Sequence, residues 1–88
     1  MGRYEMGAEM SAMAEAKPTP ENLFELGIAY SAGAEVEPDL VAAHKWFNIA
    51  AARGYREAAA YRQEVAREMT AMAIAEAQRA AREWLTTH

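Results

Sequence analysis

LGIAYSAGAEVEPDLVAAHKWFNIAAARG, residues 26–54, is the stretch of this chain that decides its fold. Its apolar residues recur at intervals of three and four, and the spacing is interrupted between Gly33 and Pro38. An interval near 3.6 indicates helices with one apolar face, and a short connection between two such helices favours an antiparallel arrangement. The stretch therefore predicts a helical hairpin.

The residues at the ends of this hairpin predict where its helices begin and end. Thr19, Pro20 and Glu21 supply an N-cap, a proline at the first helical position and an acid in the first turn. Gly33 suits a left-handed C-cap, so the first helix is expected to run from about 21 to 32. Asp39 caps the second helix, which is expected to run to about residue 53, before a closing glycine.

Each helix of the hairpin is expected to bury one face. On the first helix this face comprises Leu23, Leu26, Gly27 and Tyr30. On the second it comprises Leu40, Ala43, Phe47, Ala50 and Ala51, with Trp46 at the margin. Glycine inside a helix costs about 1 kcal/mol relative to alanine, so Gly27 predicts that a neighbouring helix presses too close for a side chain.

The rest of the chain predicts two more helices, over residues 55–68 and 71–85, with Thr70 as the cap of the last. Their apolar stripes comprise Ala58, Tyr61, Val65 and Met69, then Ile74, Ala77, Ala81, Trp84 and Leu85. We therefore expect an all-α fold of antiparallel hairpins stacked as a short superhelix. Residues 19–88 form this domain, and residues 1–18 are expected to be an N-terminal helix or a flexible tail.

A set of positions at fixed offsets in the hairpin carries a resemblance to a known family. These are Leu26, Gly27, Tyr30, Gly33, Asp39, Ala43, Trp46, Ala50, Ala51 and Gly54. The pattern resembles a Sel-1-like repeat, a relative of the tetratricopeptide repeats whose antiparallel helix pairs stack into curved solenoids and act as adaptors between proteins. The resemblance implies one full repeat, a truncated second repeat and a capping helix similar to those of some bacterial repeat proteins.

A possible partner-binding patch combines the N-terminal segment with the first helix of the hairpin. It comprises Met6, Met10, Met13, Phe24 and Ile28. The methionines share one stripe at spacings of four and three, and the other two residues lie about a quarter turn from the inward face of their helix. Either the methionines of the same chain cover Phe24 and Ile28, or another molecule does. Both are open because flexible methionines fill cores and also form adaptable binding surfaces.

Composition excludes several classes of function for these 88 residues. A net charge of −4 argues against nucleic-acid binding, and the absence of cysteine excludes a thiolate metal site. His44 is interpreted as a packed or rim histidine and Asp39 as a cap, so we expect no enzyme activity, no metal and no cofactor. Arg53, Arg56, Arg62 and Arg67 are interpreted as a solvated face, with docking of an acidic peptide as the alternative.

The location of the protein follows only weakly from the sequence. No run of about 18 apolar residues occurs, so we expect no membrane insertion. The N-terminus lacks the pattern of a secretory signal, which favours a cytoplasmic protein.

The function expected from these observations is a non-enzymatic interaction module that binds a partner protein or peptide through a helical face. The alternative is a homo-oligomer in which the methionine stripe and the Phe24 and Ile28 face bury against a second copy. The sequence leaves this choice open.

Overall fold

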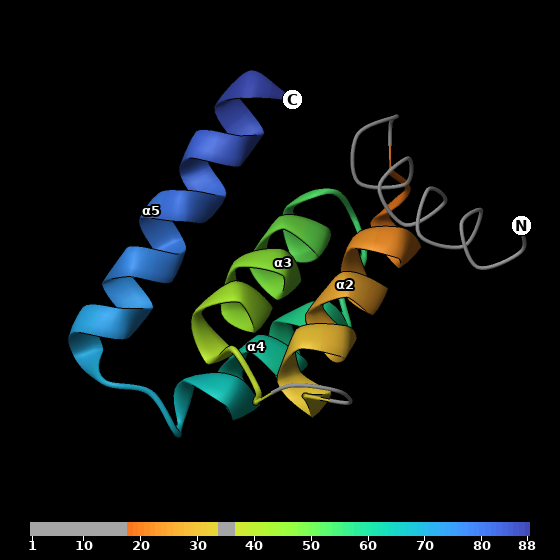
Figure 1. Cartoon of the computed structure of the whole chain (residues 1–88). Coiled ribbons are helices and arrows are strands. Elements are labelled where there is room, and N and C mark those ends of the chain that lie inside the picture. The colour runs from red at the N-terminus through yellow and green to blue at the C-terminus, as the bar shows by residue number, and fades with distance from the viewer. Residues whose placement is uncertain (1–17, 34–36) are drawn as a thin grey trace, which may run out of the picture.

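The computed structural model describes residues 18–33 and 37–88, and all regular structure in these ranges is helical (Figure 1). The helices are α2 (Pro20–Ala32), α3 (Leu40–Ala52), α4 (Ala58–Ala66) and α5 (Ala71–Thr87). The prediction of an all-α chain is confirmed. Within the same ranges, no helix has the length and apolar character that crossing a membrane requires. The predictions for residues 1–17, including the methionine stripe, lie outside the described residues.

The ends of α2 are set by the residues that the sequence marks. The backbone N–H of Asn22 donates to the Thr19 hydroxyl oxygen over 3.1 Å, and Pro20 is the first helical residue. At the other end Gly33 is left-handed, with φ 60° and ψ 45°, and its N–H donates to the carbonyl of Ala29. A left-handed residue of this kind suits glycine because it has no Cβ.

The two later caps also form as predicted. The Asp39 carboxylate accepts a hydrogen bond from the N–H of Ala42 over 3.0 Å at the start of α3. The Thr70 hydroxyl accepts one from the N–H of Ala73 over 3.1 Å at the start of α5. Gly54, after the end of α3, has a φ of 113° that L-residues with side chains rarely adopt.

Helix α3 lies at the centre of the domain. Its chain direction in Figure 1 is opposite to that of α2, and α2, α4 and α5 all pack on it. Helices α4 and α5 pack far more on α3 than on each other, so a second hairpin held together by its own interface is not confirmed. The reason is that α3 offers a different side to each of its three neighbours.

Those three sides explain which residues of α3 are buried. Phe47 points to α2, where its ring centroid lies 5.6 Å from that of Phe24. Trp46 points to α5, with its ring centroid 5.6 Å from that of Trp84. Ile49 is fully buried, although the apolar periodicity does not place it on the predicted inward face. It lies three residues after Trp46 and therefore on the side of α3 that faces α5.

Gly27 occupies a point of close helix approach, as predicted. A Cβ at this position would lie 2.5 Å from both Cδ1 and Cε1 of Phe47, which is far inside van der Waals contact. The neighbour is thus an aromatic ring that fills the place of the missing side chain. The small residues Ala43 and Ala50 are fully buried nearby in the same core.

Tyr30 is placed differently from the prediction. It was expected on the buried face of the first helix, but its side chain is 42% exposed. The buried side of α2 is centred on Leu23 and Gly27 and extends toward Phe24, because α4 packs there as well as α3. This rotation directs Ser31, four residues after Gly27, inward and leaves Tyr30 outside.

The other signature positions serve the fold as expected from their chemistry. Leu26, Trp46 and Ala51 are half-buried and pack against the core. Near the C-terminus, α4 begins at Ala58 rather than at residue 55, after a turn in which the Ala58 N–H donates to the Tyr55 carbonyl over 3.0 Å. Ala77 and Ala81 bury the inner face of α5 as predicted.

Candidate functional site

A groove lies between α2 and α4 in the part of the chain that the structure describes, with α3 as its floor. On α2 its wall includes Phe24 and Ser31, which are two helical turns apart. On the other side the wall includes Tyr61 and Val65 of α4, and Glu68 in the turn that follows this helix. The Phe24 and Tyr61 rings meet at one end, and Ser31, Val65 and Glu68 line one hollow at the other, so the two helices run in the same direction.

Aromatic side chains fill the first end of the groove. The Phe24 ring centroid lies 4.7 Å from that of Tyr55 and 4.9 Å from that of Tyr61, the latter edge to face. Phe47 lies beneath them, 5.6 Å from Tyr61. Phe24 was expected to need cover from the N-terminal segment or another molecule, but Tyr55 and Tyr61 already cover part of it. Tyr61 itself remains 45% exposed, so this end presents an aromatic ring to solvent.

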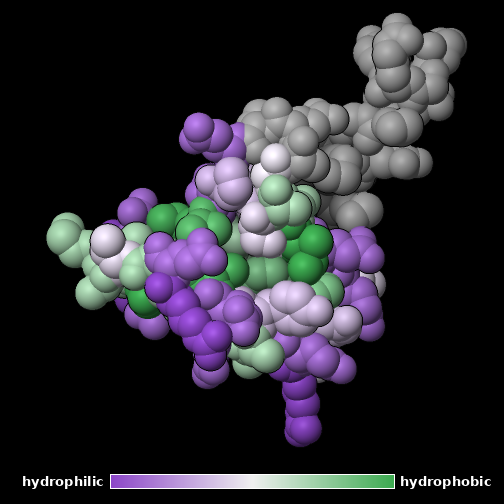
Figure 2. All heavy atoms as spheres, turned by 90° about the horizontal axis from the view of Figure 1, so that it is seen from below, coloured by the Kyte–Doolittle hydropathy of each residue, from purple (hydrophilic) through white to green (hydrophobic). Residues whose placement is uncertain are grey.

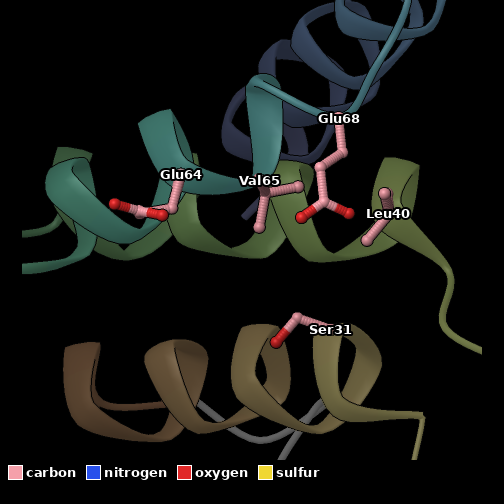
Figure 3. A pocket seen from close by; sticks show the side chains of 5 residues that line it. All are labelled: Ser31, Leu40, Glu64, Val65 and Glu68. Carbon is pink, nitrogen blue, oxygen red and sulfur yellow. The ribbon is translucent and has the colours of Figure 1, made fainter.

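The second end of the groove is a hollow of about 350 Å³ that is open to solvent (Figure 3). It is lined by Ser31 from α2, Leu40 from α3, and Glu64, Val65 and Glu68 from the end of α4. Viewed from below, this end of the molecule shows hydrophobic atoms at the surface between hydrophilic ones (Figure 2). The hollow therefore combines apolar walls with an acidic rim.

Polar side chains also lie between α3 and α4. Arg62 donates from Nη1 to the Asn48 side-chain oxygen over 2.9 Å. His44, one turn before Asn48, is buried, and its Nδ1 has no hydrogen-bond partner among residues 18–33 and 37–88. The expectation that Arg62 belongs to a solvated face is therefore wrong, because it is half-buried against α3. His44 is a packed histidine rather than one at the rim.

The environment of His44 changes its acid-base behaviour. Burial lowers the pKa of the imidazole below its usual value, and the positive charge of Arg62 lowers it further. The imidazole is therefore neutral at pH 7.

The lowered pKa of His44 predicts a pH-dependent stability. Well above pH 6.5 the imidazole is neutral in both the folded and the unfolded chain, and it adds no pH dependence. As the pH falls through 6.5, the unfolded chain binds the proton first, so the free energy of unfolding is expected to decrease. Urea denaturation at pH 7.5, 6.5 and 5.5 measures this decrease. His44→Gln should flatten the profile in this window, and an unchanged slope in that variant would contradict the assignment.

A second hollow, of about 570 Å³, lies where the C-terminal half of α5 meets the middle of α3, and it is more open than the first. Its main aromatic group, Trp84, is already stacked on the ring of His88 at 4.2 Å and packed edge to face on Trp46. The guanidinium of Arg53 lies 5.5 Å from the same ring. Since three of the domain's own side chains already pack on this indole, the groove between α2 and α4 is the better binding candidate.

The chemistry of metal sites and the comparisons add no further candidate. Within the part of the chain that the structure describes, no three His, Asp or Glu side chains are grouped so that they could hold a metal ion. Comparison of the chain with family models, with curated proteins and with solved structures finds no match. The geometry of the groove is therefore the basis on which a function can be argued.

Proposed function

We propose that the protein is a non-enzymatic interaction module of the Sel-1-like repeat type that binds a partner protein or peptide in the groove between α2 and α4. The observation that carries this proposal is the pairing of an exposed aromatic ring, Tyr61, with an open hollow at the other end of the same groove. Exposed aromatic side chains beside a concave surface are typical anchors for a partner.

The arrangement of the helices supports the repeat interpretation. Antiparallel α2 and α3 would form the repeat, and α4, which runs in the direction of α2, would begin the next one. In solenoids, corresponding helices of successive repeats lie side by side and line one binding surface. The groove between α2 and α4 occupies the place that this surface would have.

Helix α5 fits the role of a terminal cap in this proposal. Its buried side carries alanine, whereas its outer side carries the exposed charged residues Glu76, Arg79, Arg82 and Glu83. The last unit of a repeat array needs such a polar outer side to stay soluble. The superhelical stacking itself remains part of the proposal.

The test is selection of peptides from a random displayed library against the full chain, followed by binding measurements by fluorescence anisotropy. Tyr61→Ser is expected to weaken the selected peptides about tenfold, because it removes the exposed aromatic anchor. The matched control is Met72→Ser on α5, since Met72 is 84% exposed and lies outside the groove. Circular dichroism of both variants checks that they remain folded.

Two results would contradict the proposal. One is that Met72→Ser weakens binding as much as Tyr61→Ser does, or that no peptide is selected at all. The other is a dimer in light scattering that Tyr61→Ser dissociates. That second result would establish the alternative, a homo-oligomer that uses the face of Phe24 and Ile28 together with Met6, Met10 and Met13.

A further inference from the structure

The acidic end of the groove has a chemical character that specifies what it can bind. Glu64 and Glu68 stand at its rim, with Val65 between them and Leu40 beyond Glu68 (Figure 3). Ser31 lies opposite, and its hydroxyl turns back to its own helix, where it donates to the carbonyl of Ile28 over 3.0 Å. The charged groups that line the hollow are thus two carboxylates.

The two carboxylates differ in how their charge is balanced. Glu64 pairs with Arg67 over 3.2 Å, but both side chains are mostly exposed, so the pair is weak and easily exchanged. Glu68 has no cationic partner within 4 Å among residues 18–33 and 37–88. A ligand here therefore meets an unbalanced negative potential.

The shape and the charge together select one kind of side chain. Lysine and arginine have an aliphatic stem that packs on apolar carbon and a cationic head that needs an anionic or polar partner. A purely apolar side chain would leave the carboxylates partly dehydrated without compensation, and an acidic one would be repelled. The hollow fits the stem against Leu40 and Val65 and the head beside Glu68.

We propose that this end of the groove binds a lysine or arginine side chain of the partner, which deepens the proposed function and rests on it. The aromatic end then receives an apolar residue of the same segment against Tyr61. Tyr61 and Glu68 are seven positions apart, along the end of α4 and the turn that follows it, which at the rise of a helix corresponds to about 10 Å. An extended peptide advances about 3.3 Å per residue, so the basic residue should follow or precede the apolar one by about three positions.

Fluorescent peptide pools of defined design test this inference on the full chain. Each pool is random except for leucine at one position and, three positions away in either direction, lysine, arginine, norleucine or glutamate. The lysine and arginine pools are expected to bind roughly five- to tenfold more tightly than the norleucine pool at low salt, and the glutamate pool least tightly. Raising the salt concentration to about 0.5 M should reduce the difference, because exposed charges are then screened.

Variants of Glu68 separate a direct contact from a general charge effect. Glu68→Gln should remove most of the preference for lysine and arginine, and Glu68→Lys should shift it toward glutamate. Glu76→Gln, an exposed residue on α5 away from the groove, changes the net charge equally and should leave the preference intact. Equal effects of Glu68→Gln and Glu76→Gln would overturn the inference.

The outcomes distinguish this inference from the proposed function. If all pools bind with the same affinity and Tyr61→Ser weakens all of them, the groove binds peptides but the basic preference is wrong. If no pool binds, both proposals are wrong. Preference for lysine and arginine that depends on Glu68, together with loss of binding in Tyr61→Ser, supports both.

Discussion

Replacing Phe47 with alanine is expected to lower the free energy of unfolding by about 3 to 5 kcal/mol, the cost of removing a fully buried aromatic ring from a packed core. Phe47 is 1% exposed, and its ring contacts those of Phe24 and Tyr61. It also fills the space beside Gly27. Because one side chain joins α2, α3 and α4, its loss leaves a cavity that no single neighbour can fill.

Urea denaturation followed by circular dichroism measures this effect. Small domains are stabilised by only about 5 to 15 kcal/mol in total, so Phe47→Ala removes a large share of the stability. Phe47→Leu gives a measurable second variant with a smaller loss. Ala52→Gly is the control for a change in α3 at an exposed position, with an expected loss of about 1 kcal/mol. A loss of that small size for Phe47→Ala would show that the ring is not a core element.

Replacing Gly27 with leucine is expected to destabilise the domain by about 2 to 4 kcal/mol, because the added side chain would be forced into the Phe47 ring. Even the Cβ would lie 2.5 Å from two ring carbons. The ring cannot move away freely, since Phe24 and Tyr61 pack on it. Either the ring or the whole of α2 must therefore shift.

The control for this substitution lies two residues further along the same helix. Ala29→Leu adds a similar side chain on the exposed side of α2 and should change the urea midpoint little. Combining Gly27→Ala with Phe47→Leu should cost less than the sum of the two single changes, because the smaller side chain makes room for the Cβ. Strict additivity in this double variant would show that Gly27 and Phe47 do not compete for one space.

Local signals predict the helices of this domain well. Thr19, Gly33, Asp39 and Thr70 each act within a few residues, through one hydrogen bond or one backbone conformation, so the sequence carries the whole of their effect. Periodicity likewise identifies α5, whose buried alanines repeat on a single side. These features depend on no contact with distant parts of the chain.

Burial on α3 is harder to predict because it depends on how many neighbours the helix has. If α3 had a single buried side, as its apolar periodicity predicts, Ile49 and His44 would lie at or beyond the edge of that side. Both are buried, since α5 covers one and α4 lies against the other. The same assumption places Tyr30 inside, whereas the position of α4 rotates the buried side of α2 away from it.

The candidate site was predicted in part. The sequence singles out Phe24 and Ile28 as residues that need cover beyond the hairpin partner, and both line the groove or its edge. It does not reveal that Tyr55 and Tyr61 provide some of that cover, because Tyr55 belongs to a turn and the contact joins residues far apart in the chain. In the sequence Glu64 and Glu68 are indistinguishable from ordinary solvated charges. Only the structure shows that they line a hollow together with Leu40 and Ser31.

The central place of α3 affects how a ligand would influence the whole domain. In a linear array each unit contacts only its neighbours, so the end units can melt separately. Here α2, α4 and α5 all depend on the same helix, so none of their interfaces can persist once α3 is lost. A ligand that joins α2 to α4 therefore raises the free energy of every unfolding event in which α3 is lost, and α5 loses its interface in those same events. Release of α5 alone leaves the groove intact, so the ligand protects the C-terminal helix only against unfolding that includes α3.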